Sequence, residues 1–483
     1  MTDAFANATD RTSAQDGRFQ GVEARARIAD VIAILRERYG ARLSTGTAVR
    51  EQHGHGEAFA KMLPPDAVVW PQSTDEVSAI LALCHERQVP VIPFGAGTSL
   101  EGHVSALQGG ITVDLSRMDR VLAVHAEDFD CVVQPGVTRE ALNDHLRNTG
   151  LFFPVDPGAN ASLGGMISTR ASGTTTVRYG TIAHNVLALE VVMADGSVIR
   201  CGNRARKSSA GYDLVRIFTG SEGTLGIITE ATLRLHGRPE AVGSGVVSFP
   251  DLRGAVQSVI DLSQSGAPLA RIEFLDEVQV RACNAYSKLT LPEMPTLFLE
   301  FDGTIASVTE QFERAREIVA SHGARGIDWA FDEQQRAILW KARHSAYFAA
   351  RTLRPGCECV VADVCVPISA LADCVAAARA EVDAAGLVAP IVGHVGDGNF
   401  HVLFLLEPGN ADEHARMERV YDAMIAHAHR VEGTCTGEHG IGMGKRGKLI
   451  AEFGEPVVQL MRELKQAWDP TGILNPGKVF DGN

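Results

Sequence analysis

The chain has 483 residues, more than one ordinary hydrophobic core can accommodate, so two or three domains are expected. It is 45% hydrophobic and 22% charged, which is typical of soluble globular proteins. The net charge of −14 argues against nucleic-acid binding, because that binding relies on Lys and Arg against phosphates. No apolar run in the sequence reaches membrane-spanning length, so no transmembrane segment is expected.

The first 18 residues are polar and lack the apolar core of a secretory signal. Three aspartates among them weaken a transit-peptide interpretation. We therefore predict a cytoplasmic protein, and peripheral association with the inner membrane stays open. The nine cysteines are scattered without a CxxC pair, which indicates ordinary thiols in a reducing compartment rather than an iron–sulfur centre. If the protein moves electrons, another molecule must then accept them.

The first half of the chain mixes helices with short strands. Helical periodicity predicts helices over 21–39 and 75–88, with Gly40 ending the first. Val- and Ile-rich runs then alternate with glycine loops, and strands are predicted at 89–94, 110–115, 131–134, 186–193 and 226–235. A further helix is predicted over 138–148, with Thr138 as its N-cap. This irregular order favours an α+β ligand-binding domain over a regular βαβ array.

A second α+β region begins after Pro239. Strands are predicted at 244–249, 296–301, 359–366, 391–394 and 400–406. The long helices predicted here cover 308–322 and 412–430, and a tail helix is predicted over 455–468. Two domains and a C-terminal tail follow from this pattern.

Glycine-rich loops are the first chemical signal. The segment Pro93-Phe-Gly-Ala-Gly-Thr-Ser-Leu-Glu-Gly102 follows a predicted strand, but Leu100 replaces the third glycine of a dinucleotide fingerprint and no helix follows. A Rossmann fold is therefore excluded, although consecutive small residues still leave backbone N–H groups free to surround a phosphate. Similar loops recur at 156–166, at 171–180 and at 219–228. Four such loops favour a long cofactor threaded through the domain.

Two histidines and a Glu-His pair are the second signal. His394 and His401 flank glycines that oppose a helix, and apolar runs on both sides predict two strands joined by a turn. With Glu438, the two imidazoles make a three-ligand set for a divalent metal, and His439 remains for proton transfer. From the residues alone, Glu438 and His439 could exchange these two roles.

The order of these motifs, with RYG, WKARH and DPTGILNPGK between and after them, resembles the FAD-linked D-2-hydroxyacid dehydrogenases of the vanillyl-alcohol-oxidase fold. Within that family the chain is most similar to the cytochrome-type D-lactate dehydrogenases. The resemblance implies a vanillyl-alcohol-oxidase-type FAD-binding domain and an antiparallel-sheet cap domain. It divides the chain into four parts. An N-terminal helical segment, 1–60, packs on the FAD domain, and the FAD-binding domain covers 61–240. The cap covers 241–430, and a C-terminal segment, 431–483, returns to the FAD domain.

The resemblance also implies which positions contact FAD. They are Pro93, Gly95, Ala96, Gly97, Thr98, Ser99, Leu100, Pro157, Gly158, Leu163, Gly164, Gly165, Ser168, Ala171, Ser172, Gly173, Tyr179, Gly180, Glu222, Gly226, Ile227, Ile228 and Asn475. One position departs from the family, because relatives commonly carry Asn where this chain has Arg170. The departure puts one FAD contact or the local fold in doubt.

The resemblance also assigns roles to the histidines and to Glu438. His394, His401 and Glu438 would bind zinc or manganese, and His439 would remove the substrate's hydroxyl proton. Arg343 would hold the substrate carboxylate, since guanidinium groups bind carboxylates through two hydrogen bonds. The implied reaction is oxidation of D-lactate to pyruvate by hydride transfer to flavin, with a cytochrome or quinone as the external acceptor.

Alternatives stay open at this stage. The same chemistry could act on glycolate or on D-2-hydroxyglutarate, whose second carboxylate could meet cationic residues near Arg343, namely Lys341, His344, Arg351 and Arg354. A noncatalytic flavin-binding subunit is a further alternative, which the metal ligands argue against. A homodimer is compatible with the sequence. The run Lys445, Arg446 and Lys448 is interpreted as a solvated loop. No carboxylate stands at ligand spacing from the remaining histidines considered, which are therefore interpreted as surface or core residues: His53, His55, His414, His427 and His429.

Overall fold

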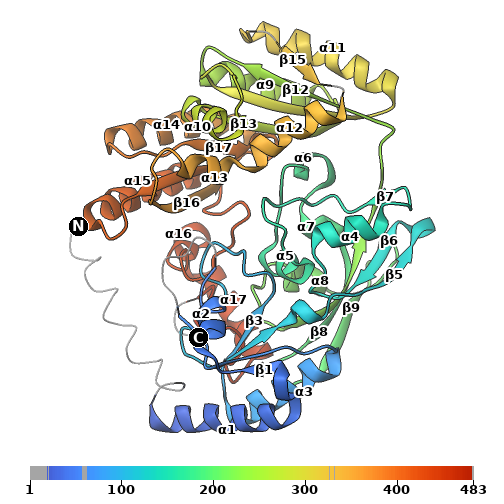
Figure 1. Ribbon diagram of the computed structural model, residues 1–483, viewed down its shortest axis with the longest axis vertical. Helices are drawn as coiled ribbons and strands as arrows, with labels where there is room; N and C mark the ends of the chain where they lie inside the picture. Colours follow the sequence, from blue (N-terminus) through green and yellow to red (C-terminus); the bar gives the residue numbers. More distant parts are fainter. Residues whose placement is uncertain (1–18, 20, 57–62, 326, 331, 481–483) are drawn as a thin grey trace.

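The computed structural model describes residues 19, 21–56, 63–325, 327–330 and 332–480. These residues form two bodies, drawn one above the other in Figure 1. The lower body contains the N-terminal half and the last helices of the chain, and the upper body contains the cap. Parts of the predicted N-terminal segment, residues 1–18, 20 and 57–60, lie outside the described residues.

A small mixed sheet forms the base of the lower body. Its strand order is β1-β2-β4-β3, and β2, β4 and β3 run parallel. The strands are Leu43–Ser44, Ala67–Val69, Ile111–Asp114 and Val91–Phe94. Helices α1 (Val22–Tyr39) and α3 (Thr74–Arg87) pack on it because their apolar residues share one face, and together they form one core.

A second sheet of the lower body is antiparallel, with order β5-β6-β10-β8-β9. Its strands are Val121–His125, Asp130–Val133, Ile227–Arg234, Val186–Val192 and Val198–Gly202. Three helices pack around its core: α4 (Arg139–Leu146), α5 (Leu163–Thr169) and α8 (Leu214–Phe218). Shorter elements complete the body: α2 (Thr47–Gln52), β7 (Leu151–Phe152), α6 (Thr176–Tyr179), α7 (Ile182–Asn185) and β11 (His236–Gly237).

The cap is built on a seven-stranded antiparallel sheet with order β15-β12-β14-β13-β17-β18-β16. Its strands, in that order, are Ile327–Ala330, Ala241–Ser248, Thr296–Gly303, Leu269–Leu275, Ile391–His394, Asn399–Leu406 and Glu358–Cys365. Because side chains alternate between the faces of a sheet, each strand contributes to two separate cores.

The two faces of the cap sheet differ in what covers them. One face packs against four long helices: α9 (Leu252–Gln264), α11 (Ile305–Ser321), α14 (Leu371–Ala384) and α15 (Ala411–Arg430). The other face packs in part under α10 (Glu277–Ser287), α12 (Glu333–His344) and α13 (Ala346–Arg351). The rest of this second face looks toward the lower body.

The chain ends in the lower body. Helices α16 (Lys448–Phe453) and α17 (Glu455–Trp468) lie beside the blue and cyan segments in Figure 1. Leu474 then forms a parallel bridge with Val91, and Asn475 donates its backbone N–H to the Val91 carbonyl at 2.8 Å. This return places Asn475 beside β3, the strand that leads into the first glycine loop.

Most predicted elements are present within a few residues of their predicted bounds. Gly40 ends α1 with a positive φ of 54°, and the Thr138 hydroxyl accepts the Ala141 N–H at 3.2 Å as an N-cap. One predicted loop is wrong, since residues 163–169 form helix α5. Strand β13 was not predicted, and it proves important for the site.

All nine cysteines are free thiols, and each is buried except Cys365, which is half-buried. This agrees with the predicted ordinary thiols. Within the described ranges, no helix is both long and apolar enough to cross a membrane.

Candidate functional site

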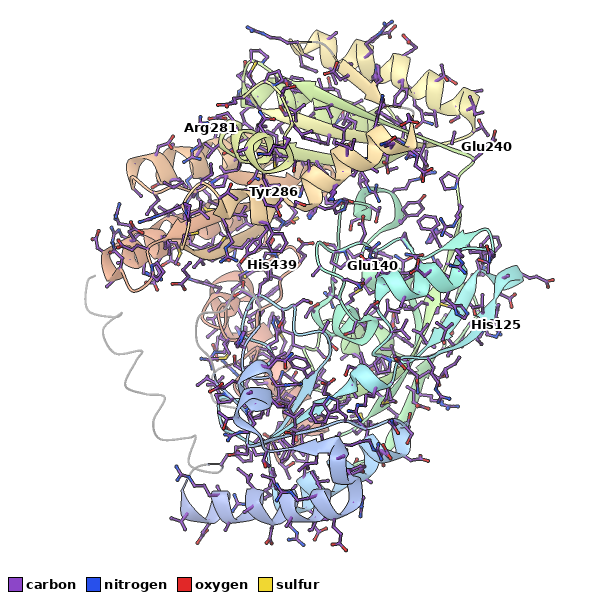
Figure 2. The ribbon with its side chains drawn as sticks, viewed as in Figure 1. His125, Glu140, Glu240, Arg281, Tyr286 and His439 are labelled. Carbon is purple, nitrogen blue, oxygen red and sulfur yellow. The ribbon has the colours of Figure 1, made fainter. Side chains whose placement is uncertain are left out.

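One cavity of about 360 Å³ lies between the lower body and the uncovered part of the cap sheet. Figure 2 shows His439 between the two bodies, on the C-terminal segment that joins them. Most of the predicted FAD contacts line this cavity: Pro93, Gly95, Ala96, Gly97, Thr98, Ser99, Leu100, Pro157, Gly158, Gly164, Gly165, Ser168, Ala171, Ser172, Glu222, Gly226, Ile227, Ile228 and Asn475. The predicted metal and substrate residues His394, His401, Glu438, His439 and Arg343 line it as well.

Four predicted FAD contacts lie outside the cavity lining. Leu163 is fully buried in the core under α5. Gly173 packs against the Asp156 backbone, where an added Cβ would approach the carbonyl oxygen to 2.4 Å. Tyr179 donates its hydroxyl to Asp302 of the cap at 2.6 Å, and Gly180 ends the short helix α6 with a φ of 73°. These residues shape the walls and the contact between the bodies.

The three predicted metal ligands converge on one point. Glu438 Oε1 lies 3.3 Å from His394 Nε2 and 3.2 Å from His401 Nε2. Ser172 of the lower body donates to the other Glu438 oxygen at 2.5 Å. Two imidazole nitrogens and a carboxylate oxygen at such separations fit a divalent ion that keeps positions open for water or substrate. The donor set therefore fits the predicted metal.

Strand pairing brings the two histidines together. His394 ends β17 and His401 lies in β18, joined by a turn whose residue Gly398 has a φ of 77°. A Cβ on Gly398 would lie 1.9 Å from the Val366 carbonyl oxygen, so glycine is required for both conformation and space. The imidazole rings end 5.5 Å apart, as the predicted two-strand arrangement requires.

Buried carboxylates lie beside the outer ring nitrogens of these histidines, and one of them forms a hydrogen bond. Glu273 of β13 accepts a hydrogen bond from His394 Nδ1 at 2.8 Å. Asp363 of β16 lies opposite His401 in the sheet, with Oδ1 3.6 Å from His401 Nδ1. Carboxylates at the far nitrogen of histidine are typical of metal sites, because they fix the tautomer and the ring orientation. The sequence interpretation missed both carboxylates.

Asp363 also holds the segment that carries Glu438 and His439. Its Oδ2 accepts the backbone N–H groups of both residues, at 3.0 and 3.1 Å, and the Thr436 hydroxyl at 2.8 Å. His439 stacks on His401 with centroids 5.0 Å apart, and its Nδ1 lies 3.9 Å from Asp363. The position of the proposed base thus depends on the same carboxylate as a metal ligand.

The prediction of a solvated loop is wrong at Lys445. Its side chain is 2% exposed, and its ammonium lies 3.1 Å from Glu101 and 3.7 Å from Asp363. Arg446 donates to the Gly477 carbonyl, and Lys448 pairs with Asp422. Asp363, His401 and His439 also form a compact donor set, but the Lys445 ammonium already balances the charge there. We therefore do not assign a second metal to it.

The histidines apart from the site are core or surface residues, as predicted, but three of them have carboxylate partners. His53 is buried, and its Nε2 lies 3.0 Å from Asp114. His414 pairs with Glu358 and His429 with Glu452, at 3.2 and 3.3 Å. These three carry carboxylate partners from distant parts of the chain, which spacing along the sequence does not reveal.

The electrostatics of the site follow from its burial. Burial opposes the charges, but Glu273 and Glu438 raise the pKa of His394 well above its ordinary value. Burial likewise opposes the charge on Glu438, while His394 and His401 hold its pKa well below the usual range. Burial lowers the pKa of His439 to about 4, and the charges of His401 and Lys445 add to this effect. His439 is therefore neutral at physiological pH and able to accept a proton.

Arg343 pairs with Glu273, the carboxylate that also binds His394. It is 7% exposed on α12, its guanidinium pairs with Glu273, and its Nε is buried without a hydrogen-bond partner. A buried cation with a free donor at a cavity wall suits a carboxylate ligand. Of the nearby cations considered for a second carboxylate, His344 lines the cavity, whereas Lys341 and Arg351 are exposed and Arg354 binds Glu413.

Arg170 faces away from the cavity. It ends α5 in the left-handed conformation with a φ of 57°, and its guanidinium donates to the Thr219 carbonyl at 3.0 and 3.2 Å. Asn, the residue that the resemblance implies here, also tolerates this conformation well. The arginine keeps the turn and binds the 219–228 loop from outside.

The lower half of the cavity suits FAD. The hydroxyls of Ser99 and Ser162 are buried at its wall without a protein partner, so they can bind a polar ligand. A Cβ on Gly95 would lie 2.2 Å from the Ser162 hydroxyl, which leaves room there only for backbone. Asn475 is held in place by donating to the His103 and Glu222 carbonyls at 3.1 and 2.8 Å.

Glu222 has a use that was not predicted. Its two carboxylate oxygens accept the backbone N–H groups of Ile441 and Gly442, both at 2.7 Å. The residue therefore ties the FAD side of the cavity to the segment that follows His439.

Comparison with known proteins agrees with this geometry. Residues 65–202 match the family described as FAD binding domain, and residues 238–479 match FAD linked oxidases, C-terminal domain. The chain is 52% identical to the probable mitochondrial D-lactate dehydrogenase of Danio rerio, over 91% of this chain and 89% of that protein. It is 44% identical to the mitochondrial D-lactate dehydrogenase [cytochrome] of Arabidopsis thaliana, over 89% and 76%.

A solved structure of p-cresol methylhydroxylase with substrate bound has the same fold, with a TM-score of 0.78 and 17% identity over 95% of this chain and 98% of that one. Both relatives are named as mitochondrial, so the cytoplasmic location stays a prediction. The chain adopts the vanillyl-alcohol-oxidase fold, with an FAD-binding domain and an antiparallel cap. It belongs to the FAD-linked oxidase family, in the group formed by the D-lactate dehydrogenases.

Proposed function

We propose that the protein oxidises D-lactate to pyruvate at a metal site formed by His394, His401 and Glu438, and that it passes the electrons through FAD to an external acceptor. The observation that carries the proposal is that both histidine nitrogens lie within 3.3 Å of one Glu438 oxygen, in a cavity that buried Arg343 and neutral His439 also line. The family membership and the match to the FAD binding domain support FAD as the flavin.

Arg343 would bind the carboxylate of the acid. Its guanidinium is fixed by Glu273 and has a free Nε, so little conformational freedom is lost when a carboxylate binds. A zinc or manganese ion held by the three ligands would polarise the 2-hydroxyl and lower its pKa. FAD, when bound, accepts hydride from the α-carbon.

His439 would take the hydroxyl proton at Nε2. Its Nε2 lies 3.8 Å from Glu438 Oε1, next to the ligand set, and its Nδ1 faces Asp363. Asp363 would stabilise the imidazolium that forms, as carboxylates do behind catalytic histidines. Glu438 is better suited to metal binding than to proton transfer, because it lies between both histidine nitrogens.

The cavity wall favours a small monocarboxylate. Val361, Val392 and Leu403 line it from strands β16, β17 and β18 and offer no partner for a second carboxylate. Among the predicted second-carboxylate partners only His344 lines the cavity, and its Nδ1 is within 2.7 Å of the Trp340 carbonyl. D-2-hydroxyglutarate is therefore less favoured, and glycolate would leave the apolar wall unfilled. The acceptor is proposed at the level of a cytochrome or quinone.

Anaerobic mixing of the FAD-loaded protein with single acids tests the substrate. Flavin absorbance should bleach fastest with D-lactate and more slowly with glycolate and D-2-hydroxyglutarate, while L-lactate should leave it oxidised. Faster bleaching by D-2-hydroxyglutarate or glycolate would contradict the choice of substrate. No bleaching by any 2-hydroxy acid would contradict the enzymatic proposal in favour of a noncatalytic flavin-binding subunit.

A further inference from the structure

One buried carboxylate joins the two functional ends of the site. Glu273 lies in the middle of β13 with its side chain 1% exposed. Its neighbour Phe274 pairs with Gly393 of β17, so Glu273 stands beside His394 on the face of the sheet that looks toward the cavity. Glu273 itself does not line the cavity, so any effect on substrate must pass through its neighbours.

The two oxygens of Glu273 serve two different residues. Oε1 accepts the hydrogen bond from His394 Nδ1 at 2.8 Å, and Oε2 accepts one from Arg343 Nη2. With both donors in place, the buried charge has one partner on each oxygen. Such a carboxylate is stable only while these partners remain, because an unpaired charge inside a protein is costly.

We propose that Glu273 is a positioning residue that sets the metal ligand His394 and the acid-binding Arg343 together. This inference rests on the proposed function. By accepting the hydrogen bond from Nδ1, Glu273 would keep the proton on that nitrogen and leave Nε2, beside Glu438, available to a metal ion. Binding Nη2 fixes the plane of the Arg343 guanidinium. Loss of the carboxylate should therefore weaken metal binding and acid binding at the same time.

The neighbouring strand supplies a matched control. Glu300 of β14 is also a buried carboxylate paired with an arginine, since Arg271 Nη1 donates to it at 2.8 Å. Its other oxygen accepts the Ser244 hydroxyl at 3.0 Å, and it touches none of the proposed metal ligands. Glu273→Gln and Glu300→Gln thus remove equivalent buried charges, but only the first removes a contact to the site.

The experiment compares these two variants as full-length, FAD-loaded proteins. Zn²⁺ and Mn²⁺ dissociation constants are measured by competition with a chelator, and kcat and KM for D-lactate are measured at saturating metal. For Glu273→Gln, the metal dissociation constant should rise about 10- to 100-fold and the KM about tenfold. For Glu300→Gln, both should stay within about twofold of wild type. Unchanged metal affinity in Glu273→Gln, or equal changes in both variants, would overturn the proposal.

A second comparison separates positioning from a general loss of stability. If Glu273 acts through Arg343, then Glu273→Gln should raise KM much less in an Arg343→Lys background than in wild type. Additive effects on KM would overturn that link. If Glu273→Gln fails to fold, Glu273→Asp replaces it; this variant keeps the charge but withdraws it by one methylene, and it should still weaken metal binding.

His394→Ala distinguishes failure of this inference from failure of the proposed function. Loss of metal binding in His394→Ala with normal binding in Glu273→Gln would overturn only the positioning role. Normal metal binding in His394→Ala would overturn the metal site itself, and with it both proposals.

Discussion

Asp363 and His401 stand directly opposite each other in the antiparallel pair of β16 and β18, with Asp363 Oδ1 3.6 Å from His401 Nδ1. The second oxygen of the same carboxylate accepts the backbone N–H groups of Glu438 and His439. One fully buried carboxylate therefore holds the backbone of the loop ligand and of the proposed base, and it places its charge beside the ligand from the strand. The integrity of the site depends on the charge at this position.

Replacing Asp363 by Asn should destabilise the protein even without metal. The amide would place an NH₂ group where the carboxylate oxygen accepts several hydrogen bonds, so at least one buried donor would lose its acceptor. The expected decrease in the free energy of unfolding is about 3–5 kcal/mol. Urea unfolding of the metal-free proteins measures it. Asp373→Asn removes an exposed partner of Arg253 and should cost less than about 1 kcal/mol. Equal losses in the two variants would contradict the central place of Asp363.

The same variant has a predictable pH dependence. Burial opposes the charge of Asp363, but His439, Lys445 and His401 hold its pKa well below the ordinary value. Because the pKa of Asp363 is lower in the folded state, its charge stabilises the fold at every pH above its unfolded-state pKa of about 4. That stabilisation is lost as the pH falls below this value. The difference in unfolding free energy between wild type and Asp363→Asn should thus be constant from pH 7 to 5 and shrink below about pH 4. A difference that grows on acidification would contradict this assignment.

Gly398→Ala should damage the turn between the two histidine strands. Its φ of 77° costs about 1–2 kcal/mol for a residue with a Cβ, and the Val366 carbonyl would lie 1.9 Å from that Cβ. Gly409 has the same φ but nothing within 4 Å, so Gly409→Ala should show only the backbone cost. Thermal unfolding and metal affinity of both variants separate the two effects. Equal losses of thermal stability and of metal affinity in the two variants would contradict the steric role of the Val366 carbonyl.

Arg343→Lys should raise the KM for D-lactate by about tenfold or more, because an ammonium cannot offer the paired N–H groups of guanidinium to a carboxylate. The FAD content should remain normal. Arg336→Lys, on the same helix, changes a residue outside the cavity lining and should leave the KM unchanged. Steady-state kinetics at saturating acceptor measure both. A KM near wild type in Arg343→Lys would assign the carboxylate to another group.

His439→Asn should lower the rate of flavin reduction by D-lactate about 10²- to 10⁴-fold, the usual contribution of a general base. Metal and FAD contents should be unchanged. His414→Asn alters a histidine on α15, paired with Glu358, and should keep the wild-type rate. Rapid-mixing spectroscopy gives these rates. Wild-type reduction in His439→Asn would shift the proton transfer to a different residue.

The neutral state of His439 predicts the pH profile. Burial lowers its pKa to about 4, so the base stays unprotonated down to mildly acidic pH. The kcat/KM for D-lactate should therefore show no loss between pH 8 and 5.5 from protonation of this residue. An acidic limb near the ordinary histidine value of about 6.5 would contradict the burial effect.

Local sequence patterns predicted most of the helices and strands well. Alternation of apolar residues around the glycine turn predicted the two strands of His394 and His401, since that pattern depends on neighbours in the chain. Helix α5 was predicted as a loop because its two glycines, its serine and its threonine disfavour helices when taken alone. Packing of Leu163 and Ile167 into the core overrides that preference.

The carboxylates behind the ligands needed the tertiary fold. Glu273 is 121 positions from His394, and only the pairing of β13 with β17 brings them together. Asp363 did leave a signal, because an acidic residue in the apolar run Cys359–Val366 must be paired if the strand is buried. Lys445 gave no such signal, since a basic run in a glycine-rich loop is usually solvated.

Metal removal tests the central claim most directly. The FAD-loaded protein is stripped with a chelator, mixed anaerobically with D-lactate, and then mixed again after addition of Zn²⁺ or Mn²⁺. The account predicts that D-lactate bleaches the flavin only in the metal-containing protein, while dithionite bleaches it in both, and that His401→Ala behaves as the stripped protein does. Rapid bleaching by D-lactate in a protein shown to contain no metal would contradict the proposed site.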